Sequence, residues 1–153
     1  MNIAMKLMLV CTSGGHFSTM KRLKSFWEQH ERIWITDLKQ DTKELKGKEQ
    51  VHWLPYQGPR NFIKLVINIP KIFRILAKER PDLIISTGAS IAVGFAWLAK
   101  LFGVRFIFIE SISRSTELSL SGKLIYPVCD EIYVQWPELS QRYAKTVFKG
   151  YVS

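Results

Sequence analysis

The chain has 153 residues, enough for one globular domain and too few for two full ones. Hydrophobic residues make up 47% and charged residues 23%, which excludes an intrinsically disordered chain. Lysine and arginine number 22 against 13 acidic residues, and the resulting charge of +9 favours a polyanionic partner: nucleic acid, anionic lipid or a phosphorylated ligand.

Short apolar runs alternate with segments that favour helices or loops. The expected strands are residues 5–11, 32–36, 51–54, 82–86, 104–109 and 131–135. The expected helices are residues 18–29, 60–79, 89–102, 116–127 and a short one after Pro137, and residues 37–50 are expected to be a loop or short helix. This alternation predicts a Rossmann-like, doubly wound α/β domain over residues 1–153, with a mostly parallel sheet covered on both faces.

Two glycine-containing loops follow predicted strands, at the sheet edge where ligands bind in such folds. A tight turn alone would explain either loop, but the backbone amides at a helix N-terminus also favour a phosphate group. The pattern matches neither the dinucleotide fingerprint nor the Walker A motif. The candidate anion-binding residues are Ser13, Gly14 and Gly15 in the first loop, and Thr87, Gly88, Ala89 and Ser90 in the second.

Two side chains at this edge are candidates for a general base. His16 follows the first glycine pair, and Glu110 ends the strand over 104–109. We favour Glu110 because burial at a strand end raises the proton affinity of a carboxylate. Arg114 follows it and is a candidate to pair with Glu110 or to bind a diphosphate. Asp37 ends the second strand, where a nicotinamide enzyme carries its ribose-binding acid, although a solvated loop aspartate is the simpler interpretation.

The helix expected over 60–79 carries cations along one arc and apolar residues along the other. Leu65, Val66, Ile69, Ile72, Phe73 and Leu76 are expected to face the sheet. Isoleucines at 63, 67 and 75 flank the basic stripe, a combination typical of the headgroup region of an anionic membrane. Pro70 is expected to kink or divide the helix. The candidate membrane-binding residues are Arg60, Lys64, Ile67, Lys71, Arg74 and Lys78.

Three sequence stretches together resemble one protein family: SGGH, STGAS, and IESISR followed by LSLSGKLIYPVCDEIYVQWPEL. It is the acceptor-binding subunit of split glycosyltransferases. Its members are the bacterial PssD/CpsF-like polysaccharide biosynthesis proteins and the membrane-anchoring half of the eukaryotic ALG enzyme that adds the second GlcNAc to the dolichol-linked precursor. The loops are more distantly similar to the N-terminal half of MurG. The resemblance covers nearly the whole chain.

The resemblance implies the N-terminal half of a GT-B glycosyltransferase, whose nucleotide-sugar half is a second polypeptide. The two chains would form one inverting, metal-independent enzyme, with no cofactor on this chain. The acceptor would be a polyprenyl-diphosphate-linked saccharide at the cytoplasmic membrane face, with the two glycine loops and Arg114 toward its diphosphate. Glu110 or His16 would be the base, and Gln135, Trp136 and Tyr151 would lie near the partner chain. The eukaryotic members carry an N-terminal membrane helix that this sequence lacks, so residues 60–79 would provide the membrane contact.

Two other functions remain possible from the sequence. A non-catalytic scaffold would recruit a catalytic partner to the membrane through the basic helix, without needing His16 or Glu110. A stand-alone dinucleotide enzyme would depend on Asp37. The sugar, its linkage and the acceptor glycan do not follow from the sequence.

Overall fold

The computed structural model describes residues 3–58 and 60–152. Seven parallel strands form one sheet in the order β3-β2-β1-β4-β5-β6-β7. The strands are β1 (Lys6–Cys11), β2 (Glu31–Thr36), β3 (Val51–Trp53), β4 (Leu83–Gly88), β5 (Arg105–Ile109), β6 (Glu131–Val134) and β7 (Thr146–Phe148). The Rossmann-like, doubly wound fold predicted from the sequence is confirmed.

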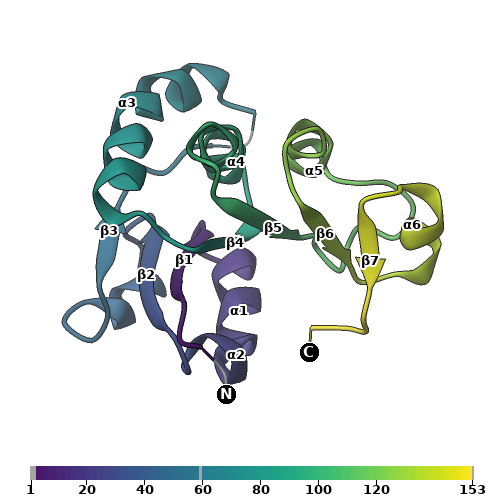
Figure 1. Ribbon diagram of the computed structural model, residues 1–153, viewed down its shortest axis with the longest axis horizontal. Helices are drawn as coiled ribbons and strands as arrows, with labels where there is room; N and C mark the ends of the chain where they lie inside the picture. Colours follow the sequence, from purple (N-terminus) through teal and green to yellow (C-terminus); the bar gives the residue numbers. More distant parts are fainter. Residues whose placement is uncertain (1–2, 59, 153) are drawn as a thin grey trace.

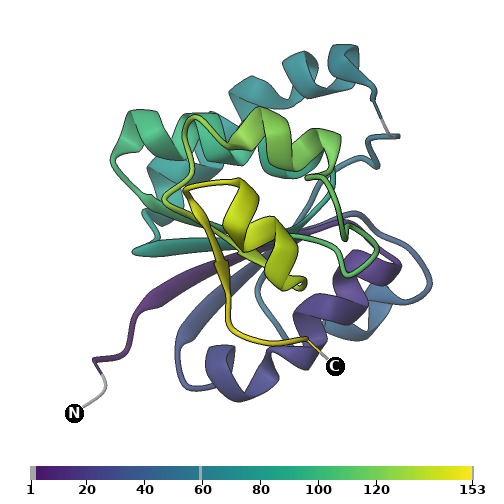
Figure 2. The same ribbon diagram turned by 90° about the vertical axis from the view of Figure 1, so that its right-hand side faces the viewer.

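Helices cover both faces of the sheet (Figures 1 and 2). On one face lie α3 (Phe62–Glu79), α4 (Ile91–Phe102) and α5 (Leu120–Ile125). On the other face lie α1 (Gly15–Arg22), α2 (Lys24–Trp27) and the C-terminal segment, while α6 (Pro137–Arg142) packs beside β7. A short 3-10 helix, η1 (Thr42–Leu45), lies between β2 and β3.

The core has two parts because the side chains of each strand alternate between the faces. In β1, Met8 and Val10 pack under α3 and α4, whereas Leu7, Leu9 and Cys11 pack against α1 and α2. All five are fully buried. Both cysteines are buried free thiols.

The structure corrects two expected helices, shows how Pro70 affects a third, and adds one strand. The helix expected over 18–29 begins at Gly15 and is interrupted at Leu23, so that α1 and α2 are separate. The helix expected over 116–127 begins only at Leu120. Pro70 does not divide α3, which is one helix of 18 residues and changes direction along its length in Figure 1. The strand β7 was missed because three residues at a sheet edge have no readable periodicity.

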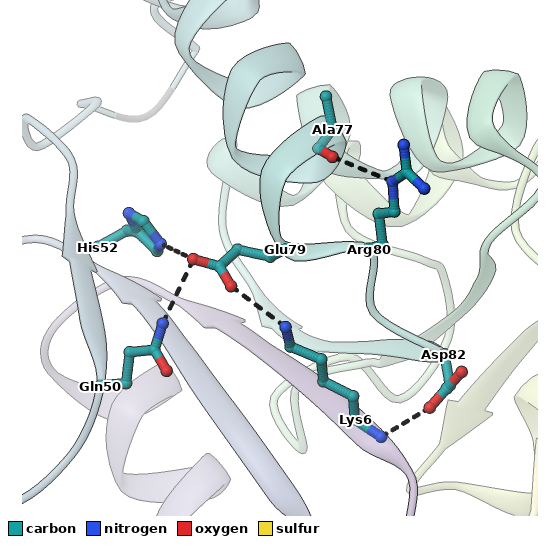
Figure 3. A network of polar contacts seen from close by, with 7 residues as sticks. All are labelled: Lys6, Gln50, His52, Ala77, Glu79, Arg80 and Asp82. Carbon is teal, nitrogen blue, oxygen red and sulfur yellow. Dashed lines mark hydrogen bonds and ion pairs between the residues drawn. The ribbon is translucent and has the colours of Figure 1, made fainter.

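A buried carboxylate holds the C-terminal end of α3 against the sheet (Figure 3). Glu79 accepts hydrogen bonds from Lys6 of β1 at 3.3 Å, His52 of β3 at 2.8 Å and Gln50 at 3.3 Å. Burial raises the pKa of Glu79, but the hydrogen bonds from His52 and Lys6 outweigh it, so the pKa lies below its ordinary value of 4.5. This network fixes α3, the helix that connects β3 at the edge of the sheet with β4 in its centre.

Candidate functional site

The candidate site lies where the sheet changes its direction of winding. β2 and β3 extend the sheet from one side of β1, and β4 begins the other side. Loops diverge at such a point and leave a crevice at the carboxyl ends of the strands. A cavity of about 840 Å³ opens here, and its lining includes six of the predicted site residues: His16, Gly88, Ala89, Ser90, Glu110 and Arg114.

His16 is held in one orientation by the C-terminal end of β4. Its Nδ1 lies 2.7 Å from the carbonyl oxygen of Thr87, while the Thr87 hydroxyl donates to the His16 carbonyl at 2.6 Å. A carbonyl oxygen only accepts, so Nδ1 carries the proton. In the neutral ring the lone pair is then on Nε2, as a general base requires.

Gly88 allows this close approach. Its φ is +115°, and a Cβ placed there would be 2.7 Å from the His16 ring atoms Cε1 and Nδ1. Only glycine fits at this position without moving the imidazole.

Glu110 is in the same cavity but has a different chemical environment. Its side chain is 1% exposed and accepts three hydrogen bonds, from the Ser111 amide at 2.9 Å, the Ser119 amide at 2.8 Å and the Ser119 hydroxyl at 2.9 Å. Ser119 is also the N-cap of α5. The carboxylate thus fastens the loop over 111–119, and the geometry favours His16 rather than Glu110 as the base.

The first glycine loop does not offer the anion site that its sequence suggests. The amide and hydroxyl of Ser13 donate to Asp37 at 2.7 and 2.8 Å, and the Gly14 amide donates to Asp41 at 2.6 Å. Carboxylates of the chain itself therefore occupy the donors expected for a diphosphate. Asp37 is 3% exposed and has this structural task, which removes the basis for a ribose-binding role.

Of the eight residues predicted to bind a diphosphate, four line the cavity. Ser13, Gly14, Gly15 and Thr87 are outside its lining, and Thr87 instead orients His16. Gly88, Ala89, Ser90 and Arg114 are inside it. The Ser90 hydroxyl oxygen is buried and has no hydrogen-bond partner among the described residues.

The cavity has an excess of positive charge. Arg60, Arg114 and Lys123 line it together with Glu110 and Glu117. Lys123 forms an ion pair with Glu117 at 2.8 Å, and its hydrogen bond lowers the pKa of that carboxylate. Neither Arg60 nor Arg114 forms an ion pair with another described residue. Two guanidinium groups are thus available to an anion.

Sequence reasoning missed some of these cavity residues. Arg60 was assigned to a membrane surface, and Ser119, Ser121 and Lys123 were placed within a longer helix. Serine is a favoured N-cap residue, and this preference is the signal by which Ser119 could have been identified as the start of α5.

The surface of α3 carries most of the basic stripe, and its apolar face differs from the expected one. All six candidate membrane-binding residues are exposed; Arg60 precedes α3, and the other five lie on it. Val66, Ile69 and Phe73, expected against the sheet, are 62%, 39% and 46% exposed, whereas Ile75 and Asn68 are buried. The Phe73 ring contacts that of Phe102 on α4, with centroids 5.0 Å apart.

We call the resulting region the α3–α4 apolar surface, because the exposed apolar side chains of α3 adjoin those of α4 across that aromatic contact. Its members are Phe62, Ile63, Val66, Ile67, Ile69, Phe73, Trp97 and Leu101. Exposed apolar surface beside a basic stripe is typical of an interaction site. None of the helices within residues 3–58 and 60–152 is both long and apolar enough to cross a bilayer.

The residues predicted to face a partner chain divide between the interior and the surface. Gln135 is 3% exposed, donates to the Glu110 carbonyl and accepts from the Val152 amide, each at 3.0 Å, so it is not a surface contact. Tyr151 is 55% exposed and packs edge-on against Trp136. Tyr151 and Gln135 also line an apolar cavity of about 290 Å³ between the sheet and the C-terminal segment.

Comparisons with known proteins agree with this architecture. The family described as "Oligosaccharide biosynthesis protein Alg14 like" matches residues 56–152. The chain is 31% identical to the UDP-N-acetylglucosamine transferase subunit ALG14 of Candida albicans, covering 95% of this chain and 77% of the relative. With the Yarrowia lipolytica protein of the same name the identity is 27%, covering 95% and 80%.

Solved structures show the same fold. The crystal structure of MurG from Acinetobacter baumannii superposes with a TM-score of 0.76 over 94% of this chain, at 14% identity. This chain spans 45% of that protein and matches the N-terminal half of its GT-B fold. At such low identity the likeness concerns the fold alone. The family match, the sequence relatives and the fold agree, and the chain belongs to the Alg14-like family of oligosaccharide biosynthesis proteins.

Proposed function

We propose that this chain is the acceptor-binding subunit of a two-chain glycosyltransferase, and that a separate partner chain binds the nucleotide sugar. Two findings support this. The relatives are named as subunits of a UDP-N-acetylglucosamine transferase, and the fold of this chain matches the N-terminal half of MurG. The proposed setting is polysaccharide biosynthesis, as in the bacterial PssD/CpsF-like proteins that the sequence resembles.

One observation carries the proposal: a cavity that combines an oriented imidazole with two arginines that form no ion pair within residues 3–58 and 60–152. His16 presents Nε2 as an acceptor, and Arg60 and Arg114 line the same cavity. A polyprenyl-diphosphate-linked saccharide supplies both matching groups, a diphosphate for the guanidinium groups and a sugar hydroxyl for the imidazole.

The proposed reaction is a direct displacement at the anomeric carbon of the donor sugar. The acceptor hydroxyl oxygen forms the new C–O bond while its proton passes to His16 Nε2. The bond between the anomeric carbon and the UDP oxygen breaks, and UDP leaves with the electron pair. This chain supplies the base, and the partner would hold UDP. We further propose that the reaction is inverting and requires neither a metal nor a cofactor.

The proposed location is peripheral, on the cytoplasmic face of the membrane. The α3–α4 apolar surface and the adjacent cations would rest on anionic lipid. The N-terminal end of α3 lines the cavity, so the same helix would bring the site to its lipid-linked substrate.

Reconstitution with the separate chains tests this function. The assay combines UDP-GlcNAc, a polyprenyl-diphosphate-linked GlcNAc acceptor and a candidate partner chain that binds the nucleotide sugar. We expect transfer only when both chains are present. Transfer by either chain alone, or none to any polyprenyl-diphosphate saccharide with both, would overturn the proposal.

A scaffold that recruits a catalytic partner is the second candidate, favoured by the α3–α4 apolar surface. A scaffold would not need the imidazole in the cavity. Substitution of His16 therefore separates the two candidates.

A further inference from the structure

One side of the cavity is apolar, which neither a sugar nor a diphosphate requires. Five side chains form what we call the apolar wall: Phe62 and Leu65 of α3, Val93 of α4, and Leu120 and Leu124 of α5. Phe62 is 53% and Leu120 is 42% exposed. Large apolar groups at the mouth of a charged cavity remain unfavourably hydrated unless a ligand covers them.

The three helices hold this wall together. A Cβ added at Gly94 of α4 would be 3.1 Å from Leu65 Cδ1, so Leu65 lies against the α4 backbone. The Trp97 indole donates to the Leu124 carbonyl at 3.1 Å, which ties α4 to α5. Figure 1 shows α3, α4 and α5 on the same face of the sheet. The wall is thus a built surface rather than a group of mobile side chains.

Polar and charged groups complete the rest of the cavity. Arg60, Ser90 and Arg114 face the same space as the apolar wall. A ligand that satisfies both parts needs an anionic group joined to a hydrocarbon chain. The cationic groups match the anionic end of such an amphiphile, and the apolar wall distinguishes it from a soluble nucleotide or a free sugar phosphate, which have no hydrocarbon chain to cover that wall.

The apolar wall is continuous with the outer surface of the protein through Phe62. This residue lines the cavity and also belongs to the α3–α4 apolar surface. Val66, Ile69 and Phe73 follow it at helical spacing along the same side of α3. A hydrocarbon chain that leaves the cavity over Phe62 therefore stays on apolar surface until it reaches the lipid. The cavity volume of about 840 Å³ is within the range of small-molecule sites.

We propose that the apolar wall binds the first isoprene units of the lipid-linked acceptor, next to its diphosphate, and directs the chain along α3 toward the membrane. This inference rests on the proposed function and adds a lipid-binding subsite to it. The chain would then discriminate between acceptors by their lipid as well as by their diphosphate.

The test compares two probes on the full chain by calorimetry: inorganic pyrophosphate, and farnesyl diphosphate below its aggregation concentration. We expect farnesyl diphosphate to bind at least about tenfold more tightly, because only it covers the apolar wall. In Phe62→Gln/Leu120→Gln the ratio of the two affinities is expected to fall to about 1–2, with pyrophosphate binding unchanged. Both side chains are substantially exposed, so the variant retains its fold, as a thermal melt will show.

Leu38→Gln is the matched control, because Leu38 is 51% exposed and lies outside both the cavity lining and the α3–α4 apolar surface. It should leave the ratio unchanged. Equal affinity for the two probes in the wild type, a ratio that survives in the double variant, or an equal loss in Leu38→Gln would each overturn the lipid subsite. Pyrophosphate binding that Arg114→Ala weakens would still support the diphosphate site. If neither probe binds, the diphosphate site fails too.

Discussion

The contact between Gly88 and His16 determines where the proposed base points. Gly88→Ala puts a methyl group on the imidazole and strains a backbone with φ of +115°. We expect a stability loss of about 1–2 kcal/mol from the backbone alone, together with a loss of transfer activity because the ring leaves the Thr87 carbonyl.

Gly103→Ala provides the matched control. Gly103 ends α4 with φ of +68°, but its added Cβ would meet nothing within 4 Å. We expect a comparable loss of stability in thermal unfolding, with activity retained by the folded protein. If both variants keep full activity at permissive temperature, the position of His16 is not set by Gly88.

The hydrogen-bond partners of individual site residues were the part of the site that the sequence predicted least well. The loops were identified because parallel strands end at one edge, which is a rule of topology. The partners of Ser13 and Gly14 are carboxylates 24 and 27 residues away, and no local pattern predicts them. Similarly, the sequence favours Glu110 as the base because burial at a strand end raises the proton affinity of a carboxylate. Its hydrogen bonds with Ser119, nine residues later, have no local signal in the sequence.

Among the elements, α3 depends on the buried Glu79 to hold its C-terminal end. Glu79→Gln removes the negative charge that accepts the hydrogen bonds from Lys6 and His52 (Figure 3). We expect a loss of about 1–2 kcal/mol at neutral pH by chemical denaturation. The folded pKa of Glu79 is lowered, so its stabilising contribution is complete above about pH 4.5 and disappears as the pH falls through the folded pKa.

The difference in stability between wild type and Glu79→Gln should therefore shrink under acid conditions. Glu44→Gln is the control, because its ion pair with Lys21 is 45–49% exposed and contributes at most about 0.5 kcal/mol. A pH-independent difference for Glu79→Gln would contradict the assigned role of its charge.

Helices and strands could be predicted where a long apolar pattern identified them. Which face of a helix is buried was harder to predict. The buried strands and the helices α3 and α4 follow directly from the sequence. The orientation of α3 does not, because a helical wheel with apolar residues over more than half its circumference has two possible core faces. Asn68 is buried while Val66 is exposed, contrary to hydrophobicity alone.

At the scale of the whole molecule, cations and exposed apolar side chains share one side, which predicts binding to anionic vesicles. Lys71→Glu/Arg74→Glu is expected to weaken co-sedimentation with phosphatidylglycerol vesicles by about 30-fold or more, since each basic residue contributes about 1 kcal/mol. Lys46→Glu/Lys48→Glu makes the same charge change in the loop between η1 and β3, away from α3, and should leave binding nearly unchanged. Equal weakening by both pairs would show that net charge alone drives the association.

Transfer by the reconstituted pair carrying His16→Ala tests the central claim most directly. If the imidazole deprotonates the acceptor, the rate falls by at least about 100-fold while the two chains remain associated, as gel filtration will show. Glu110→Gln should mainly raise the KM for the acceptor by loosening the loop over 111–119. Full activity of His16→Ala in an intact complex would contradict the account and leave the chain as a scaffold.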